Sequence, residues 1–314
     1  MSSPLRIVSY NVRYFGHALR GLASTRTSKM AIATRLSDLK PRADIICLQE
    51  VETVSLRSKI ALKKSVPKQT QLEDFMGELE SVHRSMGEEV PYDAFYFRAH
   101  AYRLGNQPLY TTGLAILVNR NTLKVEGHNV DSPHHITHHH VERFKDRKQS
   151  RICAHMRVTT KEGRALHVFN THLSLPTPFA KQFWSQKEKM GFGANQVREA
   201  ATLASFVKTH AKEEPFVVCG DFNSPPGSPV FEYLTQEAKL VCAQAHLKQI
   251  DPKISRAFPT AGFMRLRMHL DHLFSGGPCE WVDLKDTHPI DHPENKFNGL
   301  SDHTPLVGRF RLGG

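Results

Sequence analysis

Polar side chains occur on each of five apolar, strand-like runs in this chain, and this pattern limits the possible folds more than any other feature. The polar positions are Asn11, Glu50, Asn170 with His172, Asp221 with Asn223, and Ser301 with Asp302 and His303. Short runs rich in β-branched residues predict strands. Packing alone does not require a carboxylate, amide or imidazole on every strand. We therefore expect one rim of a sheet to carry convergent polar groups.

A sixth run, residues 270–274, places Asp271 between apolar neighbours. An unpaired carboxylate is costly to bury in such surroundings. We therefore expect Asp271 to have a polar partner.

Amphipathic helices are predicted between the strands. Apolar residues recur at helical spacing in three segments, residues 30–39, 71–86 and 195–211. Asn195 is expected to cap the third helix, and Ser228 with Pro229 is typical of the start of a further one. A strand pair is expected at residues 113–118 and 152–158. Strands mixed with helices predict an α/β fold in which two sheets pack together and helices cover them.

The whole chain, residues 1–314, is expected to form one domain. Its length exceeds the usual single domain, but α/β and sandwich folds often run to about 250 residues as one unit. The first motif lies at Asn11 and the last at His303, so both ends of the chain must contribute to one site.

The net charge of +11 favours polyanionic partners, although an excess of Lys and Arg also serves solubility. The five cysteines are odd in number and lack metal-ligand spacing, which favours a reducing compartment. No apolar stretch reaches the roughly 18 residues that a membrane span requires. We therefore expect a cytoplasmic protein.

Two further segments have an unusual composition. Residues 128–151 hold a cluster of histidines, at 128–140, followed by basic residues, and we expect a long polar loop that can take up transition metals incidentally. Residues 179–192 interleave Phe, Trp and Lys. This second segment either stacks nucleic-acid bases or covers the sheet rim, and the sequence leaves both interpretations open.

Taken together in their order, six motifs resemble the endonuclease/exonuclease/phosphatase superfamily, which includes deoxyribonuclease I. They are Ser-Tyr-Asn-Val at 9–12, Leu-Gln-Glu-Val at 48–51, Asn-Thr-His-Leu at 170–173, Gly-Asp-Phe-Asn-Ser at 220–224, Leu-Asp-His-Leu at 270–273 and Ser-Asp-His at 301–303. Each motif is short, but six in sequence over nearly the whole chain form a specific signal. The resemblance implies a four-layer α/β sandwich, with two mostly antiparallel sheets flanked by helices. It also implies hydrolysis of phosphoesters with a divalent metal.

The resemblance implies a metal site of hard oxygen donors. Glu50 is the expected ligand, with Asn11 and Asp302 completing the shell directly or through water. Mg²⁺, or Mn²⁺ in its place, commonly binds one or two protein carboxylates and keeps its remaining ligands as water and substrate oxygens.

The same resemblance assigns catalytic roles. Asp221 would hold or deprotonate the attacking water, and Asn223 would orient the phosphate or that water. His303 would contact the phosphate while Asp271 accepts its other ring proton. Asp221 is favoured as the general base, with His303 as the alternative.

Two remaining polar positions are expected to face the substrate. His172 would donate to the phosphate or protonate the leaving group, and Asn170 would hold neighbouring substrate atoms.

Substrate identity is only partly constrained. A histidine at 172 is unlike the asparagine of apurinic-site endonucleases, and the extended signature of inositol-polyphosphate phosphatases is missing. The stretch after Asp221 locally resembles poly(A) deadenylases. We expect a phosphodiesterase acting on nucleic acid or a nucleotide-containing substrate. The alternatives are a sphingomyelinase-like enzyme that contacts membranes peripherally and a non-catalytic polyanion-binding module.

Overall fold

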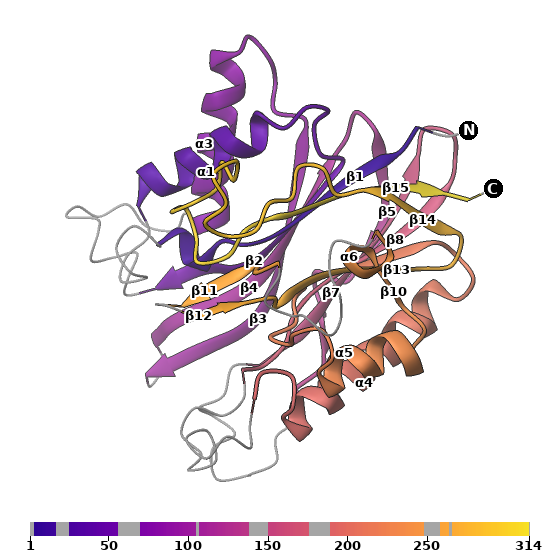
Figure 1. Ribbon diagram of the computed structural model, residues 1–314. Helices are drawn as coiled ribbons and strands as arrows, with labels where there is room; N and C mark the ends of the chain where they lie inside the picture. Colours follow the sequence, from indigo (N-terminus) through magenta and orange to yellow (C-terminus); the bar gives the residue numbers. More distant parts are fainter. Residues whose placement is uncertain are drawn as a thin grey trace.

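The computed structural model describes residues 3–16, 25–55, 70–104, 107–137, 150–175, 189–247, 258–263 and 266–313. Two large sheets pack face to face, with α1 (Arg26–Ser37) and α3 (Gln71–Ser85) over one sheet and α4 (Ala194–Ala211) over the other (Figure 1). This confirms the predicted four-layer α/β sandwich.

Both sheets are mixed and mostly antiparallel. The first has the order β14 (Cys279–Asp283), β15 (Leu306–Leu312), β1 (Leu5–Asn11), β2 (Ile45–Ser55), β4 (Gln107–Asn119) and β3 (Tyr92–Leu104). The second has the order β10 (Val241–Cys242), β13 (Asp271–Gly276), β9 (Phe216–Asp221), β8 (Ala165–His172), β7 (Ile152–Thr160) and β5 (Leu123–His128), with β6 (His134–His135) also on β7. Only β1–β2 and β8–β9 pair in parallel among the described strands.

Short elements complete the described chain. They are the 3-10 turn η1 (Arg13–Phe15), α5 (Pro229–Glu232), the π-helical turn η4 (Tyr233–Glu237), α6 (Ala243–His246), and the hairpin of β11 (Ala261–Phe263) and β12 (Leu266–Met268). The ends of the chain are adjacent because Leu5 of β1 pairs with Phe310 of β15.

Helix boundaries follow local capping chemistry. Thr70 accepts from the Glu73 backbone N–H while Glu73 accepts from that of Thr70, a capping box that starts α3. Ser228 caps α5, with Pro229 in its first turn, as the sequence predicts. The expected Asn195 cap of α4 is wrong, because Gly193 takes that position and Asn195 already lies inside the helix.

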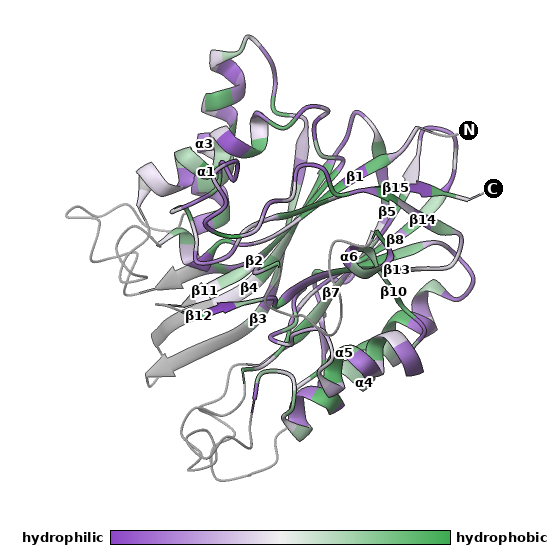
Figure 2. Ribbon diagram, viewed as in Figure 1, coloured by the Kyte–Doolittle hydropathy of each residue, from purple (hydrophilic) through white to green (hydrophobic). Residues whose placement is uncertain are grey.

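Alternation along the strands separates two apolar cores. Ile7, Ile45 and Cys47 point between the sheets, whereas Val8 and Ile46 pack beneath α1 and α3. Figure 2 shows the strands between the helical layers as mainly hydrophobic and α4 as carrying both hydrophobic and hydrophilic residues. Burying both strand faces explains why these runs read as continuously apolar.

Three sequence expectations need correction. Residues 301–303 are not in a strand, because β15 begins only at Leu306. The strands at 113–118 and 152–158 form but lie in different sheets, as parts of β4 and β7. Within the histidine-rich segment, His134 and His135 pair with β7 rather than lying in a loop, and residues 138–149 fall outside the described residues.

All five cysteines are free thiols. In the part of the chain that the structure describes, no helix is both long and apolar enough to span a membrane.

Candidate active site

Strand register brings four predicted residues to one rim of the sandwich. His172 ends β8 opposite Asp221 at the end of the parallel strand β9. Asp271 begins β13, which runs antiparallel to β9, and is also opposite Asp221. Asn11 ends β1 in the facing sheet, and its amide crosses the gap to Asp221. The first residue of the antiparallel strand β13 therefore lies at the same rim as the last residues of β8 and β9.

Asp221 occupies the centre of the cluster. Asn11 Nδ2 donates to Asp221 Oδ2 at 3.1 Å and also approaches Glu50 Oε1 at 3.2 Å. The Nε2 atoms of His172 and His303 lie 3.4 and 3.7 Å from the same Asp221 oxygen. Three side chains from distant parts of the chain therefore surround one buried carboxylate.

His303 and Asp271 form the pair that the sequence predicts. Their Nδ1 and Oδ2 atoms are 2.9 Å apart, and only 2% of Asp271 is exposed. This contact leaves Nε2 of His303 directed to the Asp221 side. The backbone N–H of His303 also donates to the Ser301 hydroxyl, which itself donates to the Asn11 carbonyl at 2.7 Å.

Unusual backbone conformations support the cluster. Gly220 has φ of 144°, and a Cβ there would lie 1.9 Å from the Thr171 carbonyl oxygen, so only glycine fits. Glu50 and Asn223 have φ of 56° and 48°. Such values are uncommon for residues with a side chain and are found at functional sites. At Glu50 the register of β2 against β4 also shifts.

Helix α4 secures the loops on either side of the rim. Gln196 Nε2 donates to the carbonyls of Ser174 and Asn223, and Glu199 accepts from the Ser174 N–H and hydroxyl. The Asn223 side chain itself donates to the Leu173 carbonyl at 2.8 Å. Asn223 is therefore held beside Asp221, and its backbone N–H donates to Asp221 Oδ1 at 2.9 Å.

The pKa values within the cluster are pushed apart. Burial raises the pKa of Asp221, with His303 opposing and Asp271 adding to the effect. Burial lowers the pKa of His303, but the carboxylates of Asp271 and Asp221 more than compensate, so its pKa lies above the ordinary value. Burial, with Arg151 and His303 nearby, holds the pKa of His172 well below its ordinary value. His303 is thus cationic and His172 neutral at pH 7.

Carboxylate donors at the rim suit a hard divalent cation. Burial raises the pKa of Glu50, and the neighbouring Asp302 raises it further. The ionised form of Glu50 would therefore be stabilised by an additional positive charge. A divalent cation would supply that charge, and oxygen ligands such as these are the ones Mg²⁺ prefers. Asp302, an expected metal ligand, also forms an ion pair that the sequence did not predict, between its Oδ2 and Arg13 Nη1 at 2.7 Å.

Asn170 is the expected site residue that the structure places elsewhere. It is fully buried one layer beneath the rim. Its Nδ2 donates to the carbonyls of Leu48 and Ala115 in the other sheet, and its Oδ1 accepts from Gln49 at 2.8 Å. Because both amide hydrogens are used, Asn170 joins the two sheets and is not available to substrate.

Sequence reasoning missed two arginines at the site. Arg13 lies two residues after Asn11, and Arg151 directly precedes the strand that pairs with β8. Arg151 lines a pocket together with Glu50 and His172, and its buried Nε has no hydrogen-bond partner. The available signal for both arginines was their position next to the end of a predicted strand. In a chain with 42 Lys and Arg residues, that position alone does not distinguish them from other basic residues.

The aromatic and basic segment lies mainly outside the described residues, because 176–188 are not described. Phe192 is described and is 45% exposed. Whether this segment stacks bases or covers the rim stays a prediction.

Comparisons with known proteins place this geometry in a family. The Endonuclease/Exonuclease/phosphatase family matches residues 8–303. No curated protein matches the chain by sequence.

Several solved structures share the fold. The human Nocturnin catalytic domain with bound sulfate has 19% identity and a TM-score of 0.62, with 98% of this chain and 93% of that one covered. ANGEL2, described as a 2',3'-cyclic phosphatase, has 18% identity and a TM-score of 0.61, with 98% and 95% covered. The mannosyl-6-phosphatase of Bacteroides thetaiotaomicron has 16% identity and a TM-score of 0.59, with 98% and 100% covered. The six motifs, the sandwich that unites them and the match over residues 8–303 agree, and the chain belongs to the Endonuclease/Exonuclease/phosphatase family of phosphoesterases.

Proposed function

We propose that this protein is a Mg²⁺- or Mn²⁺-dependent phosphodiesterase that hydrolyses nucleic acid or a nucleotide-containing substrate by attack of water on phosphorus. The observation that carries the proposal is the convergence of Asn11, His172 and His303 on the Asp221 carboxylate. A phosphodiester is anionic and repels hydroxide. Its hydrolysis therefore requires charge neutralisation, an oriented water and stabilisation of the leaving oxygen.

Asp221 is the proposed general base. Its raised pKa makes it a better proton acceptor than an ordinary carboxylate, and its Oδ2 lies within 3.7 Å of polar atoms of Asn11, His172 and His303. Asn223 is proposed to orient the water or the phosphate. The raised pKa of His303 argues against its use as the base and supports a role as a cationic contact to phosphate oxygen.

His172 is proposed to donate a hydrogen bond to the phosphate or the leaving group. It is neutral at pH 7 because its pKa is lowered, so one ring nitrogen carries a proton and the other does not. Asp271 is proposed as a positioning residue, since it holds Nδ1 of His303 and directs Nε2 to the reacting phosphate.

Glu50, Asn11 and Asp302 are proposed to hold the divalent cation. When bound, this cation would neutralise phosphate charge and polarise the P–O bond. Glu50 has the clearest need for a cation, because its pKa is raised by burial and by Asp302.

A nucleotide-containing substrate is supported by charge and by the relatives. The chain carries +11, and Arg13 and Arg151 add cationic groups at the rim. One neighbour in structure, ANGEL2, was solved in complex with adenosine-2',3'-vanadate, and Nocturnin was solved with a bound sulfate anion. We propose further that residues 1–314 act as a single domain and that the protein is cytoplasmic.

A substrate panel tests the proposal. Wild-type protein, Glu50→Ala, Asp221→Asn and His303→Ala would be assayed with labelled single- and double-stranded oligonucleotides, cyclic nucleotides, a phosphomonoester and sphingomyelin, in Mg²⁺ and in chelator. We expect Mg²⁺-dependent cleavage of a nucleotide substrate, lost in all three variants and retained in Glu280→Ala, a change of an exposed residue on β14. Turnover of sphingomyelin alone would replace the proposal with the lipid alternative. Metal-independent binding of oligonucleotide without turnover would indicate the non-catalytic module.

A further inference from the structure

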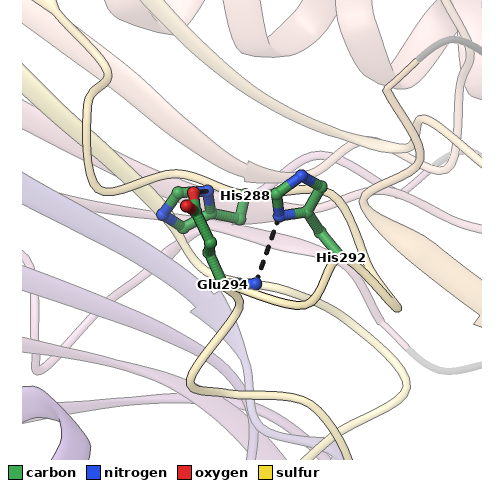
Figure 3. A group of neighbouring side chains, drawn as sticks. All are labelled: His288, His292 and Glu294. Carbon is green, nitrogen blue, oxygen red and sulfur yellow. Dashed lines mark hydrogen bonds and ion pairs between the residues drawn. The ribbon is translucent and has the colours of Figure 1, made fainter.

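A second group of potential metal ligands lies on the long connection between β14 and β15. His288, His292 and Glu294 each offer one ligand atom, and these three atoms lie within 4.8 Å of one another. Figure 3 shows the Glu294 carboxylate beside the His288 ring, with the His292 ring on the same loop. None of the three belongs to the six motifs or to the catalytic cluster.

The loop is held in place by side-chain amides rather than by the three candidate ligands themselves. Asn295 Nδ2 donates to the Pro289 carbonyl at 3.0 Å and to the Thr304 hydroxyl at 2.9 Å. Asn298 Nδ2 donates to the His292 carbonyl at 2.8 Å. Asn295 is buried, and the neighbouring Phe297 packs against Tyr10 with ring centroids 5.6 Å apart. The ligand atoms therefore start close together on a preformed loop, which lowers the entropic cost of binding a cation.

The contacts among the three side chains are weak enough for a cation to replace them. His288 Nδ1 lies 3.8 Å from Glu294 Oε2, beyond hydrogen-bond length. His292 Nδ1 accepts from the Glu294 backbone N–H at 3.3 Å, a long bond that a cation at Nδ1 would replace. The two rings lie nearly parallel, with centroids 5.4 Å apart. Ligand atoms of a tetrahedral site with bonds of about 2.0–2.2 Å are about 3.4 Å apart, so atoms within 4.8 Å of one another close by at most about 1.4 Å.

We propose that His288, His292 and Glu294 bind a first-row transition-metal cation, with Zn²⁺ the preferred species and water as its fourth ligand. Two imidazoles and one carboxylate are a donor set that Zn²⁺ uses in proteins. Mg²⁺ takes oxygen ligands instead and therefore competes poorly for two imidazoles.

A cation bound at this site would affect the catalytic cluster through the loop backbone. The Thr304 hydroxyl donates to the His288 carbonyl at 2.9 Å, and Thr304 follows His303 directly. A cation at His288 stabilises this connection and with it the position of His303. The cation would therefore stabilise the segment that carries Asp302 and His303.

Metal titration tests the site. The parent protein for all measurements would carry His138→Ala, His139→Ala and His140→Ala, because these neighbouring histidines in sequence offer a competing transition-metal site. Zn²⁺ would be titrated against a chromophoric chelator with excess Mg²⁺ present. We expect one Zn²⁺ equivalent to depend on the loop, with its affinity weakened by about tenfold or more in His288→Ala, His292→Ala and Glu294→Gln.

The matched control is His246→Ala, which removes an exposed histidine outside the loop and leaves the Zn²⁺ affinity unchanged. Circular dichroism of the metal-free variants would confirm that each remains folded. X-ray absorption at the zinc edge would show nitrogen and oxygen ligands that include two imidazoles. Equal Zn²⁺ affinity in the parent and the three loop variants, or sulfur ligation in the spectrum, would overturn the proposal.

Thermal unfolding gives an independent readout. Zn²⁺ is expected to raise the Tm of the parent, because a ligand that binds only the folded state stabilises it by mass action. The same addition is expected to raise the Tm of His288→Ala by less than that of the parent. A rise of equal size in both proteins contradicts a site on this loop.

Discussion

Asp221 illustrates how one residue acquires its chemistry from its neighbours. The side chain is 2% exposed, and contacts from both sheets converge on its Oδ2 atom. Burial favours the neutral acid, whereas the cationic His303 favours the carboxylate. The balance gives Asp221 a higher pKa than a solvated aspartate, which suits a proton acceptor near neutral pH.

Replacing Asp271 with Asn should change the pH dependence of hydrolysis. The Asp271 carboxylate raises the pKa of His303, so its removal lets His303 lose its proton at lower pH. We expect kcat to fall by about 10²–10⁴-fold. The alkaline limb of the kcat/KM profile, measured at constant Mg²⁺, should move to lower pH. An unchanged alkaline limb would show that His303 does not act as a cation.

Arg151 should contribute to binding of the anionic substrate. It lines the pocket that contains Glu50 and His172, and its Nε is buried without a partner. We expect Arg151→Ala to lower kcat/KM by about tenfold or more, corresponding to loss of a charge-assisted hydrogen bond of about 1.5–3 kcal/mol. Arg151→Lys should restore part of the loss. Steady-state kinetics at low and high salt would check this, and an unchanged kcat/KM in Arg151→Ala would exclude the role.

At the scale of single elements, close strand pairing limits what the chain accepts. Gly220 lies on β9 where the Thr171 carbonyl of β8 approaches. We expect Gly220→Ala to destabilise the protein by about 2–4 kcal/mol, because its Cβ would overlap a backbone atom that cannot move independently. Urea unfolding followed by circular dichroism would measure the change.

Gly77 provides the opposite case within helix α3. A Cβ at this position meets no atom within 4 Å. Gly77→Ala should therefore stabilise the protein by about 0.5–1 kcal/mol, the difference in helix propensity. The same unfolding assay applies, and destabilisation by Gly77→Ala would contradict the described helix.

At the scale of the whole molecule, buried neutral histidines should weaken the fold in acid. Burial lowers the pKa of His155 to about 3 and that of His269 to about 4. His269 is fully buried, donating from Nδ1 to the Phe258 carbonyl at 2.6 Å. The unfolded chain, with an ordinary pKa near 6.5, takes up protons first as the pH falls.

The contribution of His269 is therefore complete above about pH 6.5 and is lost as the pH falls toward 4, for a total of roughly 3 kcal/mol. Unfolding free energies at pH 7 and pH 5 would measure this loss. His269→Asn keeps a donor for Phe258 but does not titrate. Its stability should fall less than that of the wild type between the two pH values, and an equal fall would contradict the assignment.

Strands and helices could be predicted from the sequence because their signals are local. Alternating or continuous apolar residues and capping side chains depend on near neighbours along the chain, as at Thr70 and Ser228. The six motifs also identify the superfamily. Residue order alone therefore determined the fold class and named Asn11, Glu50, Asp221 and His303 as candidates.

Only the tertiary structure decided which side chains face the same point. Asn170 and His172 are two residues apart on one strand face, yet one is used between the sheets and the other reaches Asp221. Arg13 pairs with Asp302, and Arg151 lines a pocket with Glu50 and His172, so both arginines reach the site through contacts with residues remote in sequence. The physical reason is that burial, hydrogen bonding and charge proximity depend on distances between residues remote in sequence, and the folded sheets set those distances.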